Sequence, residues 1–149
     1  MAVQPIPEGY HTLTTYLTVD NASDAIDFYK RAFGAEELFR MPAPGGRVGH
    51  AEMRIGDSIF MLADESPDHG ARAPQGSSPV HLMIYCEDVD KVFKRSLAAG
   101  GKELRPLQNQ FYGDRSGTLA DPFGHQWTVA THVEDVPPEE MQRRMAQQK

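Results

Sequence analysis

Four histidines and one glutamate are the residues of this chain whose side chains could do chemistry. His11, His50, His81 and His132 are spread along the sequence, and Glu52 lies two residues after His50. Imidazole and carboxylate groups bind divalent metals and also act as general acids or bases. Alternate residues of a strand share a face, so His50 and Glu52 would point the same way. Either metal binding or metal-free acid–base chemistry is open, with Glu52 as the candidate base.

His81 opens a strand-like run from Val80 to Cys86. Alternation places His81, Met83 and Tyr85 on one face of that strand. Two interpretations of His81 remain open: a metal-binding or catalytic group, or a hydrogen-bonded histidine that lines a pocket. Cys86 falls on the opposite face, where a free cysteine behaves as a small hydrophobic residue.

Tyr112 and Arg115 lie in a glycine-bounded loop expected between the sixth and seventh strands. An aromatic ring and a guanidinium on a mobile loop could close over a planar or anionic ligand. The alternative is a contact between Arg115 and a carboxylate, such as that of Asp114, that only shapes the turn.

Composition and motifs exclude several classes of function. The formal net charge of −6 and the lack of a basic stripe argue against a nucleic-acid partner. No apolar run approaches the roughly 20 residues of a membrane span. Glycine-rich phosphate loops and a Gly-x-Ser-x-Gly elbow are also missing. The single cysteine forms no internal disulfide, and no signal peptide is visible at the N-terminus, so we expect a cytoplasmic protein.

Hydrophobic periodicity predicts a strand, a helix and three strands in the first half of the chain. The first strand covers 11–19, and Asp20 and Asn21 supply the turn and N-cap before a helix that Gly34 closes. The three strands that follow are expected at 36–41, 47–55 and 58–63, with Gly56 and Asp57 in a tight hairpin.

The same order of elements repeats after a segment rich in proline, glycine and serine. A strand at 80–86 leads to Asp88 as N-cap, a helix closed by Gly100, and strands at 102–106, 117–120 and 126–132. We therefore predict an α+β fold of two βαβββ modules in one domain, residues 1–149. The first module covers about 11–64, the linker 65–79, the second module about 80–132, and a tail at 133–149 carries a short C-terminal helix.

Three segments resemble the PhnB-like subgroup of the vicinal oxygen chelate (glyoxalase/bleomycin resistance/dioxygenase) superfamily. They are residues 50–58 (HAEMRIGDS), 112–127 (YGDRSGTLADPFGHQW) and 131–135 (THVED). The resemblance implies eight strands whose curved sheets form a half-open cavity. It also implies a homodimer and, in metal-dependent members, a divalent ion held by side chains of the first and fourth strands of each module.

The metal-ligand positions of that superfamily fall on Leu13, Met61, His81 and Thr128 in this chain. Only His81 is a competent ligand for a divalent metal. No metal cofactor is therefore expected. A displaced site, if one exists, would combine His81 with His11, His50 or His132.

Three functions remain open from the sequence. The first is binding of a small aromatic or amphiphilic molecule in a largely metal-free cavity. Its lining is expected from Leu13, Leu17, Met61, His81, Met83, Tyr85, Tyr112, Arg115 and Thr128. The second is a metal-dependent lyase, isomerase or dioxygenase in which His81 and Glu52 are catalytic. The third is a non-catalytic dimerisation domain that uses the C-terminal tail.

Overall fold

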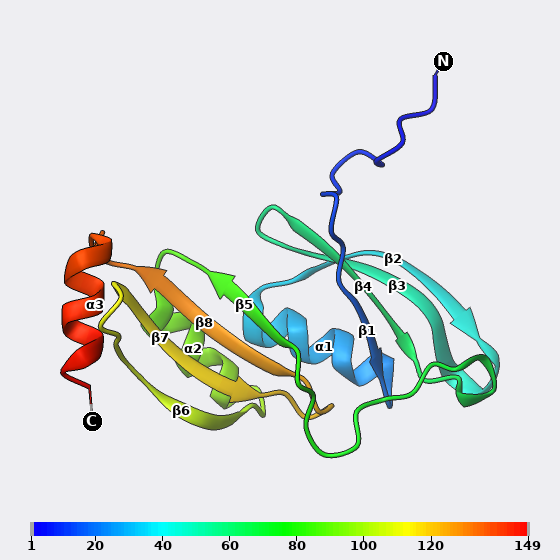
Figure 1. Ribbon diagram of the computed structural model, residues 1–149. Coiled ribbons are helices and arrows are strands. Elements are labelled where there is room, and N and C mark those ends of the chain that lie inside the picture. Colours follow the sequence, from blue (N-terminus) through cyan, green and yellow to red (C-terminus); the bar gives the residue numbers. More distant parts are fainter. Residues whose placement is uncertain (1, 149) are drawn as a thin grey trace. The chain divides into compact units, whose positions relative to one another are not determined.

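The computed structural model describes residues 2–148, which form two compact units joined between Ser77 and Ser78. This junction falls within the segment expected at 65–79 to link the modules. Each unit is one βαβββ module with a four-stranded sheet, so the predicted α+β architecture is confirmed (Figure 1). The repeat of elements that the sequence showed is thus a repeat of structure.

The first unit carries its strands in the order β1-β4-β3-β2. Strand β1 pairs with β4 in parallel, and the other pairs are antiparallel. Two 3₁₀ turns, η1 and η2, complete the unit. The elements are β1 (Tyr16–Val19), α1 (Ala22–Phe33), β2 (Glu36–Ala43), η1 (Pro44–Gly46), β3 (Arg47–Ile55), β4 (Ser58–Asp64) and η2 (Pro67–His69).

Helix α1 begins and ends at residues with left-handed backbone geometry. Asn21, at φ 80°, accepts a hydrogen bond from the amide of Asp24, and Gly34 closes the helix at φ 67°. The buried face of the helix packs its aromatic rings on the sheet, and the Tyr29 and Phe60 rings meet edge to face at 5.7 Å. One face of the first sheet is therefore closed by α1.

Asp64 ties together three backbone segments of the first unit. One carboxylate oxygen accepts from the amides of Asn21 and Ala22, each at 2.8 Å, and the other accepts from Val48 at 2.7 Å. Asp64 is 9% exposed, so these charge-assisted bonds are strong. The end of β4 is thus fixed to the start of α1 and the start of β3.

The second unit repeats the sheet order as β5-β8-β7-β6, with β5 parallel to β8. Helix α2 covers one face, and a further helix, α3, follows the sheet. The elements are β5 (His81–Tyr85), α2 (Val89–Ala98), β6 (Lys102–Asn109), β7 (Asp114–Ala120), β8 (Gln126–His132) and α3 (Pro138–Ala146).

The core of the second unit lies between α2 and the sheet. Phe93 sits so close to Gly117 that a Cβ atom there would come within 2.7 Å of its ring. Trp127 is buried on the same side and donates from Nε1 to the Asp121 carboxylate at 2.8 Å. Glycine at 117 therefore lets the helix approach the sheet.

Arg144 holds helix α3 against the second unit. Its guanidinium donates to both carboxylate oxygens of Glu134, at 2.9 and 2.8 Å, and to the carbonyl of Phe111 at 3.1 Å. Gly113, at φ 107°, lies under this tail, where an added Cβ would meet the carbonyl oxygen of Glu134 at 2.1 Å. The short C-terminal helix expected from the sequence is confirmed.

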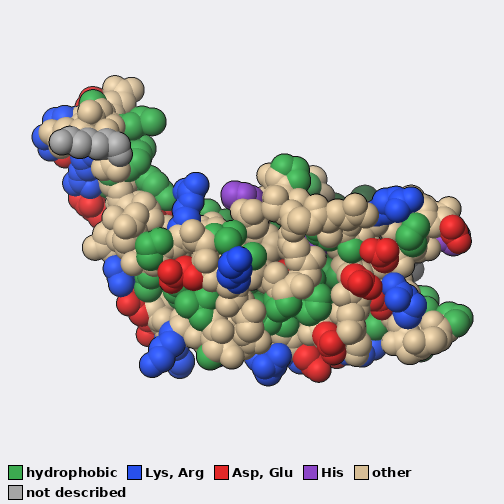
Figure 2. All heavy atoms as spheres, turned by 90° about the horizontal axis from the view of Figure 1, so that it is seen from below, with side chains coloured by type: hydrophobic (Ala, Val, Ile, Leu, Met, Phe, Trp, Pro, Cys, Tyr) green, Lys and Arg blue, Asp and Glu red, His purple; other side chains and the backbone are tan. Residues whose placement is uncertain are grey.

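Several predicted element boundaries differ from those observed. Strand β1 starts at Tyr16, so the expected start at His11 is wrong. Strand β7 starts at Asp114, which places Arg115 in a strand and corrects its expected position in a loop. None of the helices in residues 2–148 is long and apolar enough to cross a membrane. Figure 2 shows acidic and basic side chains interspersed on one face of the molecule.

Candidate functional site

The sheet face of the first unit that α1 leaves uncovered carries a row of polar and apolar side chains. Tyr16 pairs with Met61, Met61 with Glu52, and Glu52 with Phe39, so one row crosses all four strands. His50 and Met41 form the next pair along β3 and β2. We call these six residues the open face of the first unit. Neighbouring residues of the strands, such as Leu17 and Leu62, are buried under the helix.

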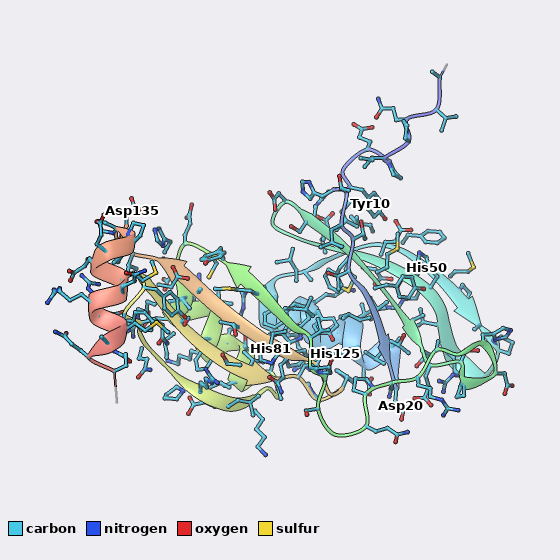
Figure 3. The ribbon with its side chains drawn as sticks, viewed as in Figure 1. Tyr10, Asp20, His50, His81, His125 and Asp135 are labelled. Atoms are coloured by element: carbon cyan, nitrogen blue, oxygen red, sulfur yellow. The ribbon has the colours of Figure 1, made fainter. Side chains whose placement is uncertain are left out.

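A chain of three hydrogen bonds runs over this open face. The Tyr10 hydroxyl donates to Glu52 Oε1 at 2.5 Å, and His50 Nε2 lies 3.0 Å from Glu52 Oε2. The Tyr16 hydroxyl lies 2.9 Å from His50 Nδ1. Figure 3 shows Tyr10 on the segment before β1 and His50 on β3. Residues far apart in sequence therefore meet in one polar cluster.

The ionised state of the Glu52 carboxylate determines which nitrogen of His50 carries a proton. Hydrogen bonds from Tyr10 and His50 lower the pKa of Glu52. Loss of hydration and the neighbouring Glu52 raise the pKa of Tyr10 to about 12. The ionised carboxylate can only accept, so His50 Nε2 carries a proton and donates it to Glu52.

This tautomer decides the role of the other ring nitrogen. In a neutral imidazole with a proton on Nε2, Nδ1 has a free lone pair, so the Tyr16 hydroxyl donates to it. Partial burial raises the pKa of Tyr16 and keeps it protonated near neutral pH. Tyr16 as a residue is 50% exposed. A hydroxyl oxygen that donates one hydrogen bond keeps lone pairs that can accept another.

The second unit also has a sheet face that its helix does not cover. Met83 pairs with Thr128, and Thr128 pairs with Thr118 across β7. His81 and Tyr85 flank Met83 on the same side of β5. These five residues form the open face of the second unit. The exposed fractions of Met83 and Tyr85 are 46% and 61%, so apolar surface is available there.

A second polar cluster lies at one end of that face and is centred on Asp114. Its carboxylate accepts from the Tyr85 hydroxyl at 2.8 Å and from His132 Nδ1 at 2.8 Å. His132 Nε2 contacts Asp135 at 2.7 Å. The bonds to Asp114 and Asp135 raise the pKa of His132, and the bond to Asp114 raises that of Tyr85. Both ring nitrogens of His132 are thus held by carboxylates.

Seven of the predicted site residues lie on the two open faces. They are His50, Glu52 and Met61 in the first unit and His81, Met83, Tyr85 and Thr128 in the second. Among residues 2–148, the His81 side chain makes no hydrogen bond or ion pair, whereas the Thr128 hydroxyl is 2.9 Å from that of Thr118. The roles proposed for these residues stay predictions.

Leu17 lies on the opposite face of the sheet from the one expected, because of a one-residue error in register, and Leu13 lies outside β1. Leu13 precedes β1 and is 89% exposed, and Leu17 is 4% exposed on the helix side. The N-cap is Asn21, so the spacing of seven that separates His81 from the cap Asp88 leads to Thr14. A shift of one residue reverses the facing of a strand, and Tyr16 takes the open side.

Arg115 and Tyr112 lie away from the open face of the second unit. Arg115 shares its side of β7 with Gly117, and its Nε and Nη2 donate to the two carboxylate oxygens of Asp90 on α2, at 2.8 and 2.9 Å. Tyr112 packs edge to face on Phe111 at 5.2 Å. Both tyrosine and phenylalanine line an apolar hollow of about 330 Å³ against α3, together with Pro138, Met141, Gln142 and Met145. The contact of Arg115 with a carboxylate is the alternative that the sequence had left open.

Two residues of the first cluster were missed in the sequence. Tyr16 was hidden by the error in strand facing. Tyr10 precedes any periodic segment, and its bond to Glu52 spans 42 positions of sequence. The shared facing of His50 and Glu52 on β3 was the only available signal for this cluster.

Comparisons with known proteins bear directly on this two-module architecture. Residues 10–129 match the profile of the Glyoxalase/Bleomycin resistance protein/Dioxygenase superfamily. The chain belongs to this superfamily. The uncharacterized protein Rv0887c of Mycobacterium tuberculosis is 41% identical over 141 residues, which cover 91% of this chain and 83% of that protein. YjdN of Escherichia coli is 30% identical over 138 residues, with coverage of 78% and 92%.

Solved structures of superfamily members share the fold. TioX from Micromonospora sp. ML1 is 29% identical, with a TM-score of 0.68, and the match covers 83% of this chain and 99% of TioX. A PhnB protein from Bacillus cereus is 25% identical, with a TM-score of 0.66 and coverage of 81% and 99%. The PhnB-like resemblance is thereby supported by structure.

The divalent metal of the superfamily does not fit the residues of this member. At its ligand positions, Met61 offers a thioether, the Thr128 hydroxyl is engaged with Thr118, and His81 alone supplies a nitrogen. Hard divalent ions need several oxygen or nitrogen donors. Within residues 2–148, no group of three or more His, Cys, Asp or Glu side chains is placed to hold a metal. We therefore derive no step through a metal.

Proposed function

We propose that this superfamily member binds a small, aromatic or amphiphilic molecule on its open sheet faces without the help of a metal. The observation that supports the proposal is the mixture of side chains on the open faces of the two units. Exposed methionine and aromatic side chains alternate with few polar groups, such as Glu52 and Thr128. Sites for small molecules are mostly apolar, with a few polar groups that set orientation.

Methionine suits such a role because its side chain is flexible and polarisable. Met41 and Met83 are 51% and 46% exposed, at register positions beside His50 and Thr128. Such side chains adapt to irregular ligands and contact aromatic rings favourably. Large apolar side chains left in water also make these rows the natural place for ligand burial. A homodimer and a cytoplasmic location remain part of this proposal.

Metal-free binding can be tested with anilinonaphthalene sulfonate, a fluorescent aromatic amphiphile, in the presence of a chelator. We expect saturable binding and about a tenfold loss of affinity in Met61→Glu and in Met83→Glu, because a carboxylate replaces an apolar contact. Val3→Glu adds the same charge at a residue that is 92% exposed and serves as the matched control. Fluorescence titration gives the dissociation constants.

Elemental mass spectrometry of protein purified without affinity metal completes the test. We expect no stoichiometric divalent metal. A bound metal that disappears in His81→Ala, or probe binding that requires added metal, would contradict the proposal and favour the metal-dependent enzyme. Equal affinity in all three glutamate variants would place the ligand elsewhere.

A further inference from the structure

The hydrogen-bonded chain of the first unit ends at the hydroxyl group of Tyr16. Tyr16 is 50% exposed, whereas Glu52 at the other end is enclosed by the bonds from Tyr10 and His50. With the His50 proton on Nε2, the Tyr16 hydroxyl donates to His50 Nδ1 and His50 Nε2 donates to the carboxylate. A proton delivered to the Tyr16 oxygen therefore has a path into the chain.

The surroundings of this hydroxyl favour a planar ligand. The ring centroids of Tyr16 and His50 are 5.6 Å apart. The ring centroid of Phe39, on the neighbouring strand β2, lies 6.3 Å from that of His50. Phe39 is 47% exposed, and Met61 pairs with Tyr16 in the sheet. Aromatic and methionine side chains around the Tyr16 hydroxyl offer a flat, apolar ligand a contact surface. The hydroxyl itself offers a hydrogen-bond partner to an oxygen atom of that ligand.

We propose that Tyr16, His50 and Glu52 form a proton-accepting site for a weakly acidic hydroxyl group carried by a planar, apolar ligand such as a phenol. This inference rests on the proposed binding function and names the ligand class of the open face of the first unit.

The proton transfer balances within the residues named. The ligand hydroxyl donates its proton to the Tyr16 oxygen, and the Tyr16 proton moves to His50 Nδ1. The ligand becomes an oxyanion that accepts a hydrogen bond from Tyr16, and His50 becomes an imidazolium. Glu52 stabilises that cation through Nε2, as a carboxylate does for a catalytic histidine. No other reactant is needed, and the total charge is unchanged.

Tyr10 is a positioning residue in this site. Its hydroxyl donates to Glu52 Oε1, which leaves Oε2 for His50 and fixes the carboxylate in place. Among residues 2–148, its hydroxyl bonds to Glu52 and not to Tyr16. Its removal is expected to loosen the carboxylate without breaking the path from Tyr16 to His50.

Para-nitrophenol is the probe for this site, because its phenolate absorbs visible light and its ionisation is read directly. Bound to the wild-type protein, it is expected to be about tenfold more acidic than in water, since its proton is taken up by His50 and the resulting imidazolium offsets the charge of the oxyanion. Tyr16→Phe and His50→Gln should each abolish this change, and Glu52→Gln should reduce it. His69→Gln changes a histidine of the same unit that bonds to Ser66 instead and should leave it intact.

Para-nitroanisole, which has the same ring and no acidic hydroxyl, separates binding from proton transfer. We expect it to bind wild type and Tyr16→Phe with similar affinity in calorimetric titrations. Two outcomes would overturn the proton-accepting site while the binding function stands, provided that the anisole binds. In the first, the bound phenol ionises as it does in water. In the second, it ionises as readily in Tyr16→Phe or His50→Gln as in wild type. If neither probe binds and anilinonaphthalene sulfonate also fails, both proposals fall.

Discussion

Both units hold a tyrosine, a histidine and a carboxylate in hydrogen-bonded contact, but in a different order. In the first unit the imidazole of His50 lies between the Tyr16 hydroxyl and Glu52. In the second unit the carboxylate of Asp114 lies between Tyr85 and His132. The order decides the chemistry. His50 keeps one nitrogen to accept a proton, whereas both nitrogens of His132 are in contact with carboxylates.

The comparison shows that residue types alone do not define a reactive cluster. Two acidic partners raise the pKa of His132 and favour its charged form, which can hold structure but cannot take up another proton. A single carboxylate at one side of His50 leaves the other side available for a hydroxyl. We therefore assign a structural role to the second cluster and a chemical role to the first.

The largest expected effect is the loss of the buried centre of the second cluster. Asp114 is 4% exposed, so Asp114→Ala leaves the Tyr85 hydroxyl and His132 without their partner and should cost about 2 kcal/mol of unfolding free energy. Glu52→Ala in the first unit should cost about 1 kcal/mol, because water reaches its partners more easily. Urea denaturation measures both.

Two optical signals distinguish a loss of stability in the second unit from one in the whole chain. The protein has one tryptophan, Trp127, which is buried in the second unit, so its fluorescence follows that unit alone. Far-ultraviolet circular dichroism follows the helices of both. Equal losses from the two substitutions would remove the structural distinction between the clusters.

A smaller effect is a difference in pH dependence. The pKa of His132 is raised above its ordinary value of 6.5 in the folded state, so its contribution is complete below that pH and is lost as the pH rises through the folded-state pKa. Trp127 fluorescence in urea should therefore report lower stability of the second unit in mildly alkaline buffer. His132→Gln should flatten this dependence, and a wild-type profile in that variant would contradict the assignment.

The contribution of Glu52 to stability changes with pH in the opposite direction. Its folded-state pKa lies below its ordinary value of 4.5, so its contribution is present above that pH and is lost as the pH falls through the folded-state pKa. The two clusters thus weaken at opposite ends of the pH range.

The smallest expected effect concerns Arg115, whose ligand contact was predicted from the sequence. Its guanidinium is bound to Asp90 on the helix side of β7. Arg115→Ala should therefore change the affinity for anilinonaphthalene sulfonate by less than about twofold, in contrast to Met83→Glu. A tenfold loss in Arg115→Ala would show that the guanidinium leaves Asp90 to reach a ligand.

The fold could be predicted in most of its elements, because hydrophobic periodicity and turn residues agree along the chain. The bounds of β3 and β8 match those expected, and both helices start at the anticipated caps. The predicted bounds are wrong where no capping or turn residue marks the end of an element. Before Tyr16 the residues are rich in threonine, which favours strands, yet they lie outside β1.

The site could be predicted only in part, since its bonds depend on register between strands. The facing of His50 and Glu52 follows from alternation within one strand. The contact of Tyr16 with His50 spans 34 positions and needs the pairing of β1, β4 and β3, which no local pattern encodes. The pairing of Arg115 with Asp90 spans 25 positions and is equally invisible to local patterns.

The three amide bonds of Asp64 also set an order of events in folding. They join this residue to Asn21, Ala22 and Val48, up to 43 positions away, so they form only after β4 has closed on the rest of the first unit. Contacts with such long sequence separation carry a large entropic cost of loop closure. We therefore expect these bonds to form late, so that Asp64→Ala speeds unfolding more than it slows folding. On this expectation, Asp64 lengthens the lifetime of the folded first unit.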